Sequence, residues 1–135
     1  MLNSSNKERS MGKKILIVDD ELDLLKVTLL RLKKTGYEVF GGADGQEALN
    51  LARQIIPDLI ILDVYLPIIN GDDVAKILKK DDELKHIPII LISATAKTLA
   101  ERTVESGASA YLAKPFEPEE LTGKVEEILA QGANL

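Results

Sequence analysis

The chain has 135 residues, about the length of one domain, and its 45% apolar and 29% charged residues are typical of a protein that folds on its own. Its 22 acidic side chains outnumber its 17 Lys and Arg, so the net charge is -5 and a nucleic acid is not expected as a partner, because phosphates repel such a surface. It has no cysteine, which excludes disulfides, thiolate metal sites and cysteine nucleophiles.

Short β-branched runs alternate with helical stretches from Lys14 onward, which predicts five βα units. Several of the runs are continuously apolar, as is typical of parallel strands covered by helices on both faces. We expect strands at Lys14–Val18, Tyr37–Gly41, Leu59–Leu62, Ile89–Ile92 and Ala110–Ala113. The helices between and after them are expected at Glu21–Thr35, Gln46–Arg53, Gly71–Lys80, Lys97–Ser106 and Pro118–Ala130.

Local signals support the expected helices. In the first, four leucines fall on one face at helical spacing: Leu22, Leu25, Leu29 and Leu32. Gly36 and Gly107 stand where left-handed residues end helices. A closed eight-stranded barrel needs about 250 residues, so the α/β pattern predicts a doubly wound, open, five-stranded parallel sheet.

The ends of the chain lead to expectations about domain organisation and location. Residues 1–12 are expected to form a mobile polar arm, 13–131 the domain and 132–135 a short tail. The longest apolar run, Ile87–Ile92, is too short for membrane insertion. Because the N-terminal residues lack an apolar signal segment, a cytoplasmic location is expected.

Polar side chains follow four of the five expected strands. Asp19 and Asp20 follow the first, Asp63 the third, Ser93 the fourth and Lys114 the fifth. Each has an ordinary explanation taken singly, as a helix cap, a turn residue or a solvated lysine. Ligands of open α/β sheets bind at the carboxyl ends of the strands, where all five would meet. The sequence therefore predicts a site at this edge.

The chemistry of these residues points to phosphoryl transfer. Three carboxylates within about 5 Å repel one another by roughly 3 kcal/mol per pair and favour a hard cation, Mg²⁺ or Mn²⁺. Asp63 is the candidate nucleophile toward phosphorus, and Asp19 and Asp20 are candidate metal ligands. The Lys114 ammonium and the Ser93 hydroxyl would each stabilise one phosphoryl oxygen.

These residues occur in motifs that resemble the receiver domain of two-component response regulators, the CheY-like fold with strand order 2-1-3-4-5. The resemblance extends from about Lys14 to Leu129. The motifs that carry it are Ile17-Val18-Asp19-Asp20, Leu62-Asp63-Val64-Tyr65-Leu66-Pro67 with Asn70-Gly71, Leu91-Ile92-Ser93-Ala94 and Lys114-Pro115-Phe116.

The resemblance implies a signalling protein that catalyses only its own phosphorylation and dephosphorylation. Asp63 would accept a phosphoryl group from a sensor histidine kinase or a histidine phosphotransfer protein. Mg²⁺ would be bound by Asp19, Asp20, Asp63 and the backbone carbonyl of Tyr65, and Lys114 would contact the phosphoryl group. Ser93 and Tyr111 would form the switch pair that changes the surface of the fourth helix, fifth strand and fifth helix for an unknown downstream protein. Alternatively, Tyr111 would be only a half-buried aromatic residue of a strand.

Further expectations concern rates and assembly. In this family the positions of Tyr65 and Thr95 tune dephosphorylation, and we expect the Tyr65 ring to hinder attack by water. The resemblance also implies a cis Lys114-Pro115 peptide bond, for which the sequence supports only the possibility. We expect a monomer or weak dimer, either free-standing or part of a longer protein.

Two other functions share features with this sequence. A haloacid-dehalogenase-type phosphatase also uses an Asp nucleophile with Mg²⁺, but needs a second Asp two residues after one on the first strand, where this chain has Glu21. A flavodoxin-like cofactor binder needs backbone donors after the first strand instead of acids. His86 is expected in a surface loop, and Asp72 and Asp73 are expected to stabilise a helix start through its dipole.

Overall fold

The computed structural model describes residues 12–133 of the chain. The predicted N-terminal arm therefore lies outside the described residues except for Gly12, and so do the last two residues of the predicted tail. The final helix continues through Ala133, two residues past the predicted end of the domain.

Five parallel strands form one sheet in the order β2-β1-β3-β4-β5, which confirms the predicted fold class and strand order. The strands are β1 (Lys14–Val18), β2 (Glu38–Gly42), β3 (Leu59–Asp63), β4 (Ile89–Ser93) and β5 (Ala110–Ala113). The helices are α2 (Leu22–Lys34), α3 (Gly45–Ile55), α4 (Gly71–Lys79), α5 (Leu99–Ser106) and α6 (Pro118–Ala133), and a 3-10 turn, η1 (Ala96–Thr98), precedes α5.

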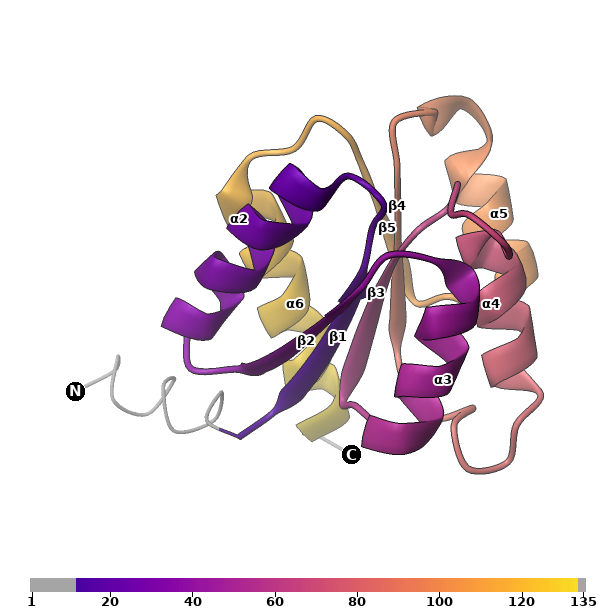
Figure 1. Cartoon of the computed structure of the whole chain (residues 1–135), viewed down its shortest axis with the longest axis horizontal. Coiled ribbons are helices and arrows are strands. Elements are labelled where there is room, and N and C mark those ends of the chain that lie inside the picture. Colours follow the sequence, from indigo (N-terminus) through magenta and orange to yellow (C-terminus); the bar gives the residue numbers. More distant parts are fainter. Residues whose placement is uncertain (1–11, 134–135) are drawn as a thin grey trace.

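The helices cover both faces of the sheet. Figure 1 shows α2 and α6 on one face and α3, α4 and α5 on the other. Along β1, Ile15 and Ile17 face the cluster with α2 and α6, whereas Leu16 and Val18 face the cluster beneath α3 and α4. Successive side chains of a strand point to opposite faces, so a strand between two helical layers must be apolar throughout. This is why the predicted apolar runs are strands.

The differences from the predicted elements have local causes. Leu25 and Leu32 are buried, but Leu22 is 59% exposed, because it is the first residue of α2, next to the edge where β1 ends. The fourth helix begins as the 3-10 turn η1, and the β2 strand runs one residue later than predicted. Gly36 and Gly107 have the expected positive φ, 104° and 80°. Between residues 12 and 133, none of the helices is both long and apolar enough to cross a membrane.

Candidate functional site

The sheet brings the predicted site residues to one edge, the upper edge in Figure 1. Val18 pairs with Leu62, Asp63 with Ile92, and Ser93 with Ala113, so the strands end at nearly the same level. Asp63 and Ser93 are the last residues of β3 and β4, and the other three residues follow directly after β1 and β5: Asp19, Asp20 and Lys114. Their placement together follows from the parallel register.

Lys114 connects three carboxylates at this edge. Its Nζ lies 2.7 Å from Asp63 Oδ2, 2.9 Å from Asp19 Oδ2 and 2.9 Å from Glu21 Oε1. The lysine, Asp19 and Asp63 side chains are all buried, whereas Glu21 is 62% exposed. Burial works against the charged ammonium, but the hydrogen bonds to Asp63 and Glu21 and the ion pair with Asp19 prevail and raise the pKa of Lys114 above its ordinary value. The amine is therefore a fixed positive charge at neutral pH.

The Asp63 carboxyl group has a perturbed pKa. Burial raises its pKa above the ordinary value, and the nearby charge of Asp19 adds to this effect, while Lys114 and the Tyr65 backbone N–H oppose it. The Tyr65 N–H donates to Asp63 Oδ1 at 3.1 Å, and Lys114 Nζ donates to Oδ2. Both oxygens thus have a donor, and the carboxylate is held in one orientation.

Glycine is required beside Asp63. Gly71 begins α4, and its N–H donates to the Val64 carbonyl at 2.7 Å, which closes the loop after β3. A Cβ on Gly71 would overlap the Asp63 carbonyl oxygen. This close approach of two backbones explains the Asn70-Gly71 pair of the sequence motif.

Ser93 ends β4, and Tyr111 lies on the neighbouring strand β5, two residues before Ala113, the partner of Ser93. The buried Ser93 hydroxyl accepts a hydrogen bond from the Thr95 N–H at 3.0 Å, an ordinary turn interaction of serine. Tyr111 is 46% exposed on the edge strand β5. The predicted switch residues thus lie on adjacent strands, with Ser93 buried and Tyr111 exposed on the outer strand.

Comparisons with known proteins agree with this geometry. The model of the response regulator receiver domain family matches residues 15–126. The chain belongs to this family. Neither a dehalogenase-type phosphatase nor a flavodoxin-like cofactor binder is a member of it, so both alternatives are set aside. The family generally works in signalling between proteins, not in the turnover of a substrate.

Two relatives differ in how much of their length this chain covers. This chain is 43% identical over 107 residues to the polar-differentiation response regulator DivK of Brucella anthropi, and the match covers 78% of this chain and 87% of that protein. It is 39% identical over 120 residues to the alkaline phosphatase synthesis transcriptional regulatory protein PhoP of Bacillus subtilis, covering 88% of this chain but 49% of that protein. The chain spans about half the length of several curated relatives that it matches.

Solved receiver structures share the fold. The chemotaxis response regulator CheY4 of Vibrio cholerae superposes with a TM-score of 0.82 at 31% identity, covering 87% of this chain and 99% of that one. A CheY-like receiver domain from Methanospirillum hungatei gives a TM-score of 0.85 at 29% identity, and the match covers 91% of this chain and 98% of that one. The receiver fold is thus shared along nearly the full length of those proteins.

The acidic group of this receiver domain fits a metal ion. One carboxylate oxygen from each of Asp19, Asp20 and Asp63 lies within 4.8 Å of the others. Asp19 Oδ2 is buried and, although it is close to the Lys114 ammonium, accepts no hydrogen bond from any described residue. A buried oxygen without a donor beside two further carboxylates is the environment that a hard cation stabilises. These residues could therefore hold a metal.

The structure also shows an interaction that the sequence did not indicate. Arg102 of α5 bonds Asp72 of α4 at 2.7 Å, and its guanidinium lies over the Tyr65 ring, 5.3 Å from the centroid. Asp72 was expected to stabilise the start of α4 through the helix dipole, but its buried side chain also has this specific partner. Its position 30 residues before Arg102 gives no local pattern that could have revealed the pair. His86 is exposed, as predicted.

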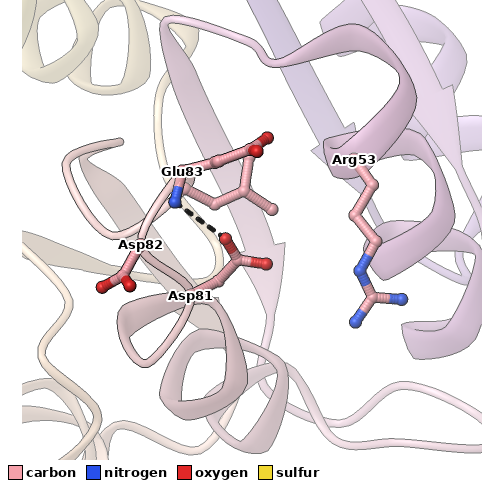
Figure 2. Close-up of a pocket in the computed structure, with 5 residues that line it drawn as sticks. Arg53, Asp81, Asp82 and Glu83 are labelled. Carbon is pink, nitrogen blue, oxygen red and sulfur yellow. Dashed lines mark hydrogen bonds between the residues drawn. The ribbon is translucent and has the colours of Figure 1, made fainter.

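A pocket of about 450 Å³ lies away from this edge. Figure 2 shows Arg53, near the end of α3, across from the loop of Asp81, Asp82 and Glu83 that follows α4. Two acidic side chains of that loop make interactions within the loop itself. Asp81 Oδ1 accepts a hydrogen bond from the Glu83 N–H at 2.9 Å, and Asp82 forms an ion pair with Lys85. The pocket contains none of the residues of the Asp63 site.

Proposed function

We propose that Asp63 accepts a phosphoryl group from the phosphohistidine of a sensor histidine kinase or a histidine phosphotransfer protein. The observation that carries this proposal is the pairing of Asp63 Oδ2 with Lys114 Nζ at 2.7 Å within a group of three carboxylates. A lone buried carboxylate would be protonated or unreactive. One that faces a fixed ammonium and a potential cation site is suited to a group that brings further negative charge.

The transfer itself needs little from the protein beyond position and charge. An Asp63 carboxylate oxygen bonds to phosphorus while the bond from phosphorus to the donor imidazole nitrogen breaks. The imidazole leaves with the electron pair and takes a proton from solvent. Lys114 stabilises one of the phosphoryl oxygens, and the buried Ser93 hydroxyl donates to another once it turns away from the Thr95 N–H.

Mg²⁺ is the proposed cofactor, and Mn²⁺ has the same ligand preference. Asp19, Asp20 and Asp63 would hold it together with the backbone carbonyl of Tyr65. When bound, it would neutralise charge on the acceptor site and on the incoming phosphoryl group. Lys114 alone cannot do this, because it already balances three carboxylates.

The proposed output is a change in the surface formed by α5, β5 and α6. Ser93 gains a phosphoryl oxygen as partner only in the phosphorylated state, so it has the differential affinity that any ligand-driven switch requires. Its movement would give Tyr111, now 46% exposed, space to turn inward. The proposed partner of this surface is a downstream protein.

Tyr65 is proposed to set how long the phosphorylated state lasts. Its backbone N–H bonds Asp63 Oδ1, so its side chain starts beside the acceptor. A ring at that position limits the approach of water to phosphorus. We expect it to slow the loss of the phosphoryl group.

The proposal is tested by incubating the protein with Mg²⁺ and acetyl phosphate and measuring intact mass. The wild type should gain the mass of one phosphoryl group, and the gain should disappear without Mg²⁺ or in Asp63→Asn. Asp73→Asn is the matched control, because it removes an exposed aspartate at the start of α4 that has no place in the site. Labelling that persists in Asp63→Asn would refute Asp63 as the acceptor.

A further inference from the structure

Arg102 joins three elements: the loop after β3, the start of α4 and the start of α5. Its Nη1 donates to Asp72 Oδ2 at 2.7 Å, on the first turn of α4, and its Nε donates to Thr98 Oγ1 at 3.2 Å, at the start of α5. Its guanidinium lies over the Tyr65 ring in the loop after β3. We call Tyr65, Asp72 and Arg102 the arginine clamp.

The anchor of the clamp is a buried carboxylate. The Asp72 side chain is 9% exposed, and its second oxygen, Oδ1, has no hydrogen-bond partner within residues 12–133. A buried carboxylate whose cation is removed is strongly destabilised, so Asp72 holds Arg102 firmly in place. Arg102 itself is 31% exposed, and without this bond the side chain would be free to move in solvent.

The other side of the clamp is the Tyr65 ring. Tyr65 is 46% exposed, and within residues 12–133 its hydroxyl makes no hydrogen bond, so the ring gains its position from packing and from the cation above it. The backbone N–H of the same residue is 3.1 Å from the acceptor oxygen Asp63 Oδ1. The clamp therefore holds the side chain of the same residue whose backbone N–H donates to the Asp63 carboxylate.

We infer that Arg102 is a positioning residue that holds the Tyr65 ring as a wall at the Asp63 site and so slows hydrolysis of the phosphorylated state. This inference rests on the proposed phosphorylation of Asp63. In the hydrolysis, a water oxygen bonds to phosphorus, the bond from phosphorus to the Asp63 oxygen breaks, and the carboxylate keeps the electron pair. The protons of the water stay with the phosphate or pass to solvent. Arg102 touches none of the reacting atoms.

The size of the effect follows from the contact. An exposed cation–π contact stabilises the held ring enough to shift its held and free populations by about two- to fivefold. If water reaches phosphorus mainly when the ring is free, Arg102→Ala should lose its phosphoryl group about two- to fivefold faster than the wild type. Arg31→Ala is the matched control, because Arg31 also bridges two helices through a carboxylate, Glu119 at 3.0 Å, but lies over no aromatic ring of residues 12–133.

The experiment is a double-mutant cycle on the decay of the phosphorylated protein, followed by intact mass after the phosphodonor is removed. Arg102→Ala should accelerate decay in the wild-type and Tyr65→Phe backgrounds, which keep the ring, and have no effect in Tyr65→Ala. A purely structural role for Arg102 would instead change decay equally in all backgrounds. That result, or unchanged or slower decay in Arg102→Ala, would overturn the inference.

Two further measurements keep the test decisive. Arg102→Lys retains a cation for Asp72 but lacks the planar group that stacks on a ring, so it should decay faster than the wild type while unfolding at the same temperature. The same decay as the wild type in Arg102→Lys, with Arg102→Ala unfolded, would also refute the inference. A wild type that takes up no phosphoryl group would refute the proposed function itself, whereas normal Asp63-dependent uptake with an unaltered decay in the variants would refute the clamp alone.

Discussion

Replacing Lys114 with methionine should destabilise the protein in a way that Mg²⁺ reverses. Methionine keeps most of the length of the side chain but removes the charge that Asp19, Glu21 and Asp63 share at 2.7 to 2.9 Å. The buried Asp19 and Asp63 would then face each other without compensation. A metal ion can supply the missing charge, so the loss of stability should depend on Mg²⁺.

The magnitude follows from the spacing of the carboxylates. Oxygens within 4.8 Å of one another repel by about 3 kcal/mol at an effective dielectric constant of 20. Breaking a buried ion pair costs about 3 to 5 kcal/mol, which agrees with this value. Without Mg²⁺, Lys114→Met should therefore lose about 3 kcal/mol in free energy of unfolding.

Urea unfolding followed by circular dichroism, with and without saturating Mg²⁺, measures both effects. The variant should bind Mg²⁺ more tightly because no ammonium repels the ion, and each tenfold gain in affinity closes the gap to the wild type by about 1.4 kcal/mol. Lys79→Met is the matched control, since Lys79 Nζ donates to two backbone carbonyls, of Lys85 and Ile87, away from the carboxylates. A gap for Lys114→Met that is the same at all Mg²⁺ concentrations would show that the reasoning is wrong.

Four further outcomes are expected. Asp63→Asn should raise the melting temperature in the absence of Mg²⁺, because a carboxyl whose pKa is raised by burial costs stability at every pH above that pKa; a lower melting temperature would contradict this. Gly71→Ala should destabilise the protein by about 2 kcal/mol or more, as urea unfolding would show, because its Cβ would overlap the Asp63 carbonyl oxygen. Tyr65→Asn should lose the phosphoryl group faster than the wild type, and equal decay would argue against a role for the ring. Ser93→Ala and Tyr111→Ala should have non-additive effects on the affinity for the downstream partner, and strictly additive effects would remove the proposed coupling.

Most of the fold could be predicted from the sequence because two independent patterns agree. The runs around Ile15, Ile60 and Ile90 are apolar on both faces, and each is followed by a segment with helical spacing and an end signal. The errors lie at boundaries, where one residue more or less changes little energy. The exposed Leu22 shows the limit of helical periodicity, which gives a face but not the place where the neighbouring layer ends.

The position of the site could also be predicted from the apolar runs of the strands. A parallel strand covered on both faces must be apolar throughout, so polar side chains can appear only where the strand ends, and in a parallel sheet all such ends are at one edge. The apolar runs thus point to Asp19, Asp63 and Lys114 before any geometry is known. The arginine clamp has no equivalent signal, because Tyr65, Asp72 and Arg102 lie on a loop and two helix surfaces whose mutual orientation depends on packing.

The residues of the site and the residues of the arginine clamp are held in place by different parts of the receiver domain. Residues that carry the proposed chemistry are fixed by strand register, which varies little as long as the core is intact. Residues that would tune its rate, such as Arg102, are fixed by side-chain contacts between helices α4 and α5 and the loop of Tyr65. Substitutions there should leave the register of the sheet unchanged. We therefore expect the lifetime of the proposed phosphorylated state to change independently of the ability to form it.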